Sequence, residues 1–161
     1  MNKGVLSSPV GILEIGEENN AIIYIKFCGE DHVIEEDESE YLTKCKEQLK
    51  EYFEGTRQSF DLKLSPEGTD FQKDVWKQLL RIPYGETKSY QYIADRVGDP
   101  GASRAVGNAN NKNPIAIVVP CHRVVGANGK LTGYAGGLDK KAWLLKHEMK
   151  HTNSEMQMDL F

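Results

Sequence analysis

The sequence contains no long apolar run. None of its 161 residues belongs to a stretch near the roughly 20 consecutive apolar residues that a membrane-spanning helix needs. The first residues, MNKGVLSSPVG, also lack the apolar core of a secretory signal. These absences argue against a membrane or secreted protein. We expect a compact protein of one or two domains that is located in the cytoplasm.

Cysteine is scarce, and its spacing argues against the common structural frameworks. Cys28, Cys45 and Cys121 are odd in number and form no CxxC pair. Neither a disulfide framework nor a four-ligand zinc site is therefore indicated. Cys28 and His32 could ligate a metal together, but the pair has no further partner nearby in the sequence. We expect no metal and no cofactor.

Basic residues are outnumbered, which at first argues against a nucleic-acid partner. The chain has 20 Lys+Arg against 24 Asp+Glu, a net charge of −4. This average hides a division: residues 1–65 hold 7 basic against 14 acidic side chains, net −7, whereas residues 66–161 hold 13 against 10, net +3. The window 101–134 contains no acid at all. A locally positive surface is therefore available to a polyanion.

The first part of the chain is predicted to be a small α/β domain. VGILEI and AIIYIKF flank the polar turn GEENN, and apolar side chains alternate in the second segment, which is typical of a β-hairpin. After the acidic loop EDHVIEEDESE, apolar residues recur at helical steps of three and four: Leu42, Cys45, Leu49, Tyr52 and Phe53. Because Cys45 lies on this stripe, we expect it to be buried and inert.

A second, mainly helical domain is predicted after the linker LSPEG. Thr69 and Gln72 form a capping box ahead of a helix that ends at IPYGE. Ser89 is placed to cap the helix YQYIADRV, which Gly98 closes, and Ser103 is placed to cap RAVGNANN. Two short helices across the turn DPGA have the shape of a helix-turn-helix.

Small residues mark the second helix of this pair. Ala105 and Gly107 accompany a single Arg104, and the helix lacks the row of Gln, Asn and Arg that usually reads base edges. Such a helix can fit closely in a groove of DNA. It would hold the phosphates through Ser103 and main-chain amides, with little sequence preference.

The segment PCHRV carries the candidate nucleophile. AIVV is predicted to be a short strand, and Pro120 cannot continue its ladder, so Cys121 would stand at a strand end. An isolated thiol has a pKa of about 8.5, so the site must supply a base or a positive field. Neighbouring side chains on extended backbone point to opposite faces, which favours contact between Cys121 and His122 through a water.

The last predicted helix, LDKKAWLLKHEMK, can supply a group that orients the histidine. Its expected core stripe is Leu138, Ala142, Leu145 and Met149. Glu148 lies near the end of this helix and is our candidate. A thiol, a histidine and a carboxylate form a relay that draws off the thiol proton.

Several of these motifs occur in the order and spacing of a known family. PCHRVV, with SYQYIA, SRAVGNA and NKNP upstream and GYAGGLDKKAWLLKHE downstream, resembles the O6-alkylguanine-DNA alkyltransferases, also called methylated-DNA–protein-cysteine methyltransferases. We therefore expect an α+β fold with a ribonuclease-H-like domain at residues 1–66, which has a small antiparallel sheet and a helix. A DNA-binding and alkyl-acceptor domain with a helix-turn-helix and a short active-site strand would span 67–150, and a flexible tail 151–161.

The resemblance implies a DNA repair protein that works on double-stranded DNA with alkylated bases. It would flip O6-alkylguanine, and O4-alkylthymine, out of the duplex and transfer the alkyl group irreversibly to Cys121. Because no nearby group can hydrolyse the thioether product, each molecule would turn over once. Arg104 would enter the stack in place of the extruded base. Tyr90 would crowd the 3′ phosphate while its hydroxyl protonates the departing guanine.

The resemblance also implies further contacts. DNA-binding roles would fall to Tyr90, Arg104, Ser103, Ala105, Gly107, Asn113 and Arg123. The base pocket would be formed by Val119, Cys121, Tyr134, Ala135 and Gly136. Ala135 departs from the family pattern, because many relatives place a serine there with its hydroxyl toward the O6 atom. The zinc ligands of some eukaryotic relatives have no full counterpart in the N-terminal half.

The last residues, QMDLF, resemble the pentapeptide that binds the bacterial sliding clamp. Met158, Leu160 and Phe161 could enter a groove of the clamp while Gln157 forms hydrogen bonds at its entrance. The alternative is a disordered or self-packed tail. The protein itself is expected to be a monomer.

Two other functions compete with alkyl transfer. A cysteine hydrolase would also use a thiol and a histidine, but the usual nucleophile signatures are missing and the helix pair would be unexplained. A non-catalytic protein that binds alkyl lesions and flags them for other repair is nearer. In such proteins the reactive cysteine is replaced, so Cys121 argues against this alternative.

Overall fold

The computed structural model describes the backbone of residues 1–159 and the side chains of residues 1–152. It divides into two compact units. Unit 1 contains residues 1–67 and 114–118, and unit 2 contains residues 68–113 and the chain from Val119 onward. The expected α+β class is confirmed. Within the described range, no helix combines the length and the apolar character needed to cross a membrane.

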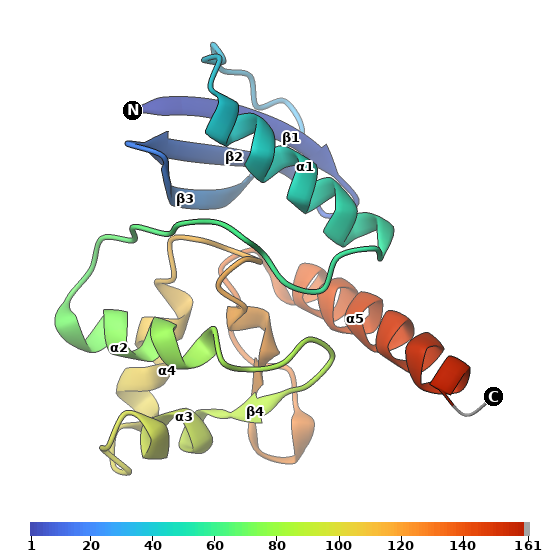
Figure 1. Ribbon diagram of the computed structural model, residues 1–161. Coiled ribbons are helices and arrows are strands. Elements are labelled where there is room, and N and C mark those ends of the chain that lie inside the picture. Colours follow the sequence, from blue (N-terminus) through green and yellow to red (C-terminus); the bar gives the residue numbers. More distant parts are fainter. Residues whose placement is uncertain (160–161) are drawn as a thin grey trace. The chain divides into compact units, whose positions relative to one another are not determined.

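Unit 1 is an antiparallel sheet with a helix lying against one face (Figure 1). The strands follow the order β1 (Asn2–Ser8), β2 (Gly11–Glu18) and β3 (Ala21–Cys28). The predicted hairpin is confirmed as β2 and β3, in a register that places Ile15 opposite Ile25. Strand β1 is not predicted, because NKGVLSS is mostly polar and lacks a clear alternation.

Helix α1 (Glu40–Glu54) closes the core of unit 1. The side chain of Ser39 accepts a hydrogen bond from Leu42 N and so caps the first turn. Four residues of the predicted stripe, Leu42, Cys45, Leu49 and Tyr52, are buried, and the fifth, Phe53, is half-buried. Burial raises the pKa of the Cys45 thiol to about 12. This cysteine therefore remains protonated and unreactive at neutral pH, as expected.

The chain returns to unit 1 for residues 114–118. Ile25 N donates to Pro114 O at 2.9 Å and Ala116 N donates to Ile25 O at 3.0 Å, which gives a single parallel bridge at Ile115. A turn follows, with Ile117 at φ 72°, a conformation that strains a β-branched residue. The prediction of a strand at AIVV is wrong, because this buried run forms a bridge and then a turn.

Unit 2 is mainly helical. Its elements are α2 (Asp70–Leu79), β4 (Lys88–Ser89), α3 (Tyr90–Arg96), α4 (Ser103–Asn111), the 3-10 turn η1 (Cys121–Arg123), β5 (Val124–Val125), the 3-10 turn η2 (Ala127–Gly129) and α5 (Leu138–Asp159). Helices α2, α3 and α4 pack against one another, β4 pairs with β5 in parallel, and α5 packs against η1. The predicted capping box of Thr69 and Gln72 is confirmed, as is the Ser89 cap of α3.

Helices α3 and α4 form the predicted helix-turn-helix (Figure 1). The cap predicted for Ser103 is wrong: Ala102 is the N-cap of α4, and it has no capping side-chain bond. Ser103 is the first helical residue, and its hydroxyl donates to Gln91 Oε1 at 2.9 Å. This bond links the two helices. Trp76 Nε1 donates to Ala109 O at 2.9 Å and fixes α2 against α4.

The buried face of α5 differs from the predicted stripe. Leu138 and Met149 are 48% and 55% exposed, whereas Lys141, Leu144 and Glu148 are fully buried. The inward face is therefore displaced by about one residue, and two of its positions hold charged groups. A pattern of apolar residues cannot identify such a face, because these polar side chains belong to the site described next.

Candidate active site

Cys121 begins the 3-10 turn η1 and does not end an extended strand. Arg123 N donates to Pro120 O at 2.9 Å, which closes the turn. The Cys121 side chain is buried, with 6% of the residue exposed. Burial raises the pKa of its thiol, and hydrogen bonding to Asn113 and the charge of Lys141 oppose this rise. The thiol therefore depends on its neighbours to become a thiolate.

Helix α5 brings the predicted relay partner to the next residue of the turn. Glu148 Oε2 lies 2.6 Å from His122 Nε2. Arg123 Nε donates to Glu148 Oε1 at 2.7 Å and Arg123 Nη2 to Oε2 at 3.1 Å, while Gly85 N donates to Oε1 at 3.2 Å. Burial alone would raise the pKa of Glu148, but the charges and hydrogen bonds of His122 and Arg123 hold it well below its usual range.

These contacts determine the tautomer of His122. Burial lowers the pKa of this imidazole, so it is neutral at neutral pH. Because Glu148 is ionised and can only accept, His122 Nε2 carries the proton and donates it. His122 Nδ1 is then an acceptor. It is buried and has no hydrogen-bond partner among the described side and main chains.

Arg123 requires a correction. The resemblance implies a DNA contact for this residue, but its guanidinium is buried. Besides its two bonds to Glu148, Arg123 Nη1 donates to Ile82 O at 2.7 Å. Paired in this way, the side chain cannot extend to a phosphate at the surface. It holds the Glu148 carboxylate in place instead.

Lys141 is a site residue that the sequence analysis missed. Its ammonium group is buried, and it donates to Thr132 O at 2.6 Å and to Gly133 O at 3.5 Å. Burial lowers its pKa to about 8, and the Cys121 thiolate favours its charged form. At neutral pH the side chain is a cation that stabilises a negative sulfur. The available signal was a lysine within the apolar periodicity of LDKKAWLLKHE.

Two tyrosines lie near this group. The buried Tyr134 hydroxyl interacts with the Cys121 thiol, and burial and the thiol raise the pKa of Tyr134. Tyr90, the first residue of α3, shares a hydrogen bond with Thr132 Oγ1 at 2.9 Å. The loop that follows Tyr134 presents Ala135 at the surface. The structure thus brings Tyr134 to the thiol, whereas Tyr90 contacts Thr132, two residues before Tyr134.

Two asparagines hold the main chain around Cys121. Asn113 Nδ2 donates to Val119 O at 2.9 Å, and Asn110 Nδ2 donates to Cys121 O at 3.4 Å. Val119 O also accepts from Cys121 N at 2.8 Å. The end of α4 therefore positions the loop that carries the nucleophile. Asn110, which is fully buried, is not identified by the sequence analysis.

The predicted DNA-binding helix presents its basic residue to solvent. Arg104 and Ala105 are exposed, while Ser103 and Gly107 are half-buried. A Cβ added at Gly107 would lie 3.8 Å from the Tyr90 ring, so α4 passes close to this tyrosine. With no acidic residue between positions 101 and 134, this surface can accept a polyanion.

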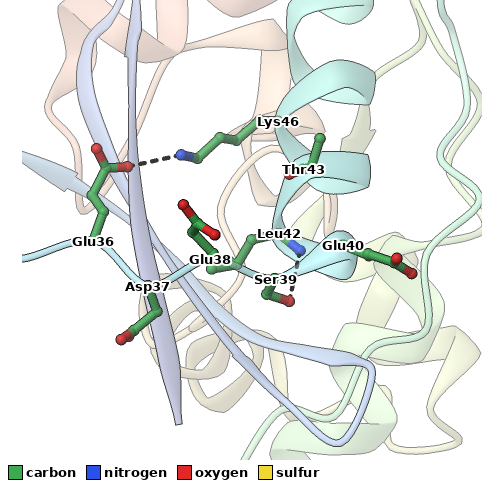
Figure 2. A pocket seen from close by; sticks show the side chains of 8 residues that line it. All are labelled: Glu36, Asp37, Glu38, Ser39, Glu40, Leu42, Thr43 and Lys46. Carbon is green, nitrogen blue, oxygen red and sulfur yellow. Dashed lines mark hydrogen bonds and ion pairs between the residues drawn. The ribbon is translucent and has the colours of Figure 1, made fainter.

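A pocket in unit 1 has the opposite charge. It has a volume of about 780 Å³ and is lined by Glu36, Asp37, Glu38, Ser39, Glu40, Leu42, Thr43 and Lys46 (Figure 2). The ammonium group of Lys46 is paired with Glu36 at 2.8 Å. Four carboxylates would repel phosphate, and the lining offers no thiol or histidine. Its chemistry does not suit the function indicated by the Cys121 site.

Only the backbone of the first three residues of the tail motif, 157–159, is described, and it belongs to α5. The side chains of Gln157 and Met158, and all of Leu160 and Phe161, are not described. The clamp motif therefore stays a prediction.

Both parts of the chain match known families. The family model described as 6-O-methylguanine DNA methyltransferase, DNA binding domain, matches residues 70–150. The one described as 6-O-methylguanine DNA methyltransferase, ribonuclease-like domain, matches residues 1–66. A methylated-DNA–protein-cysteine methyltransferase of Methanosarcina acetivorans is 52% identical over 153 residues, which cover 92% of this chain and 98% of that protein. The constitutive one of Bacillus subtilis is 49% identical over 150 residues, covering 88% and 91%.

Solved structures agree with these matches. The O6-methylguanine methyltransferase of Mycobacterium tuberculosis superposes with a TM-score of 0.84 and 44% identity, covering 93% of both chains. A structure of OGT from the same organism in complex with DNA gives a TM-score of 0.86 and 45% identity, covering 94% of both chains. The likeness extends over both units of the present chain.

Proposed function

Because the chain belongs to the 6-O-methylguanine DNA methyltransferase family, we propose that Cys121 takes the alkyl group from O6-alkylguanine in duplex DNA. The protein is a methylated-DNA–protein-cysteine methyltransferase and acts in DNA repair. The observation that carries the assignment of the acceptor is the buried Cys121 thiol, which interacts with the Tyr134 hydroxyl and with the charge of the buried Lys141.

The first step is ionisation of the thiol. The Cys121 proton passes through a water to His122 Nδ1, whose acceptor state is set by the bond from Nε2 to Glu148. The resulting imidazolium is stabilised by the carboxylate, and the thiolate by Lys141. The His122 Nδ1 atom, which has no partner among the described residues, is suited to this role.

The second step is displacement at a saturated carbon. The Cys121 sulfur attacks the alkyl carbon in line with the carbon–O6 bond, and the electron pair of that bond moves into the guanine. A proton delivered by the Tyr90 hydroxyl neutralises the leaving base. A thioether remains on Cys121. Since no group at the site can hydrolyse it, the protein is consumed in one turnover.

The base must leave the duplex before it can reach a buried thiol. Rotating a nucleotide out of the stack costs about a few kcal/mol, and less for a damaged pair. Arg104, exposed on α4, fills the space left in the stack, while Ser103, Ala105 and Gly107 let the main chain approach the backbone of the DNA. Val119 and the loop of Tyr134, Ala135 and Gly136 form the pocket for the extruded base. O4-alkylthymine enters the same pocket.

Asn113 connects these two tasks. It follows the C-terminal end of α4, donates to Val119 O, and also forms a hydrogen bond with the Cys121 thiol. Docking of α4 on DNA is thereby coupled to the position of the nucleophile. The protein acts on DNA as a monomer, with one helix-turn-helix for each lesion.

The C-terminal QMDLF supports a second partner, the bacterial sliding clamp. Met158, Leu160 and Phe161 would occupy an apolar groove, with Gln157 at its entrance. A synthetic peptide of residues 150–161 should bind the clamp, and deletion of residues 157–161 should abolish clamp binding by the whole protein. An unchanged affinity after the deletion would contradict this partner.

The transfer itself is tested by mass. The protein is incubated with a duplex containing one O6-methylguanine and digested, and the Cys121 peptide should gain the mass of one methylene group. Cys121→Ser should leave the lesion unrepaired, whereas Cys45→Ser should not prevent transfer. Repaired DNA beside an unmodified Cys121 peptide would refute the proposal. Tight binding of a lesion that is never repaired would favour the non-catalytic alternative.

A further inference from the structure

Three side chains of different chemistry meet in unit 1, outside the alkyl-acceptor site. Glu14 of β2 pairs with Lys26 of β3, so Cys28, two residues further along β3, is a diagonal neighbour of Glu14 on the same face of the sheet. After β3 the chain turns back, with His32 N donating to Gly29 O at 3.1 Å. Strand register and turn together bring a carboxylate, a thiol and an imidazole to one place.

The ligand atoms of Glu14, Cys28 and His32 all lie within 4.8 Å of one another. Glu14 Oε1 is 2.7 Å from His32 Nε2. A tetrahedral zinc ion with bonds of about 2.0–2.3 Å separates its ligand atoms by about 3.3–3.8 Å. The three donors can reach this arrangement through small side-chain rotations, with no change in the strands that carry them.

The Glu14 carboxylate is held ready for such a role. It is buried, and its Oε2 atom accepts a hydrogen bond from Tyr24. Gly16 makes this possible, because a Cβ there would lie 2.2 Å from the Tyr24 ring that crosses β2 to reach Glu14.

We propose that Glu14, Cys28 and His32 bind one divalent transition-metal ion of the zinc class, with a water as the fourth ligand. Mixed oxygen, sulfur and nitrogen donors suit zinc and its neighbours, whereas magnesium and calcium prefer oxygen alone. His32 and Cys28 are partly exposed, which gives the ion a path to the buried carboxylate.

Charge and protons balance at this site. Binding removes the proton of the Cys28 thiol, which passes to solvent. The two anions then neutralise the ion. Lys26 Nζ, now 3.6 Å from Glu14 Oε2, belongs to a side chain that is 57% exposed and can turn toward solvent. Tyr24 would remain as the outer partner that orients the carboxylate.

The sequence pattern could not reveal this site. Cys28 and His32 are recognisable as a pair, but Glu14 precedes them by more than ten residues and joins them only through the register of β2 and β3. All three ligands belong to unit 1, whereas Cys121 belongs to unit 2. The inference is therefore independent of the mechanism of alkyl transfer.

The test uses the whole protein after treatment with a chelator. Titration with Co²⁺ should give a thiolate-to-cobalt charge-transfer band that saturates at one ion per chain, and Zn²⁺ but not Mg²⁺ should displace it. Binding of Zn²⁺ should also release at least about one proton per ion. Absence of the band, or its displacement by Mg²⁺, would overturn the proposal.

Variants separate this site from other thiols. Cys28→Ser and His32→Gln should each weaken Co²⁺ binding by at least about tenfold, and Tyr24→Phe by about 10- to 100-fold as an outer-shell change. Glu35→Gln, an exposed acid of the following loop, and Cys121→Ser should leave the band unchanged. Circular dichroism of each variant confirms that it is folded. A folded Cys28→Ser protein that keeps the full band would refute the site.

Discussion

Glu148 Oε2 lies 2.6 Å from His122 Nε2, and neither side chain exposes more than 1% of its surface. Arg123 holds the same carboxylate from the other side. The pair therefore performs two tasks. It fixes η1 against α5, and it makes His122 Nδ1 the acceptor that a base for the Cys121 thiol requires. The Glu148 carboxylate therefore contributes both to the stability of the fold and to the reactivity of the thiol. Variants can separate these two contributions.

Glu148→Gln should nearly abolish alkyl transfer. If the Gln amide nitrogen faces His122 Nε2, it donates where Glu148 accepted, and the imidazole must move its proton to Nδ1. The base for Cys121 is then lost, which should slow transfer by about 100-fold or more. The change also leaves the Arg123 charge buried without its partner, which should lower the free energy of unfolding by about 3–5 kcal/mol.

Single-turnover transfer rates and urea denaturation measure the two effects. Asp139→Asn, at an exposed acid in the first turn of the same helix, is the matched control and should change neither quantity appreciably. A Glu148→Gln protein with a normal transfer rate would remove the histidine relay from the mechanism, whatever its stability.

Stability should fall in two stages as the pH is lowered from 7. The folded-state pKa of His122 lies below its usual value of 6.5, so its contribution is fully present above pH 6.5 and is lost as the pH falls below it. The folded-state pKa of Glu148 lies below its usual 4.5, so its contribution is lost at still lower pH. Each group lowers the free energy of unfolding by at most about 1.4 kcal/mol per pH unit.

Urea denaturation between about pH 2.5 and pH 7.5 covers both stages. His122→Gln should flatten the stage just below pH 6.5 and leave the lower one. Glu148→Gln should flatten the lower one. A wild-type free energy of unfolding that does not change from pH 7 to pH 4 would contradict the burial of His122 as a neutral imidazole, and one that does not change below pH 4.5 would contradict the burial of Glu148 as a carboxylate.

The sequence predicts much of this architecture from short-range chemistry. Caps are local, so the Thr69 and Ser89 helix starts follow directly from residue type. Period-two alternation identifies β3, and the polar turn GEENN joins it to β2. Strand β1 is not predicted, because its sequence is mostly polar and its formation depends on pairing with β2. The AIVV segment misleads because its apolar character reflects complete burial and does not specify an extended backbone.

The site is predicted in part for similar reasons. Cys121, His122 and Glu148 are recognisable by chemistry, and the structure brings the last two together. The role of Lys141 and the burial of Arg123 are not predicted, because a charged residue is expected at the surface unless its partner is known. That partner is a backbone carbonyl for Lys141 and a carboxylate 25 positions away for Arg123.

Lys141→Met should shift the pH dependence of alkyl transfer upward. The cation favours the Cys121 thiolate, so its loss should raise the thiol pKa and slow transfer at pH 7 by about tenfold for each unit of that rise. At higher pH the difference should shrink, because the pKa of Lys141 is about 8 and the wild-type side chain also loses its charge.

Transfer rates measured from pH 6 to pH 9.5 decide this point. Lys146→Met, at an exposed lysine on the same helix, should reproduce the wild-type profile. If Lys141→Met lowers the rate equally at every pH, the lysine acts through its bond to Thr132 O and not through its charge.

Arg104→Ala should impair repair of duplex DNA and spare the chemical step. Arg104 is exposed on α4, remote in sequence from the relay, and its proposed task is to replace the extruded base in the stack. Its removal should slow transfer from O6-methylguanine in a paired duplex by about tenfold or more. This slowing corresponds to a fraction of the few kcal/mol that base flipping costs. Reaction with the free base O6-methylguanine requires no flipping, so its rate should be unchanged.

A second substrate tests the physical reason for the Arg104 defect. When the lesion lies in a mismatched pair, opening costs less, and the defect of Arg104→Ala should become smaller. Lys112→Ala, which removes an exposed charge at the end of α4, should instead weaken binding of both duplexes alike and reduce its salt dependence. If Arg104→Ala behaves in the same way as Lys112→Ala, the arginine binds phosphate and another residue fills the stack.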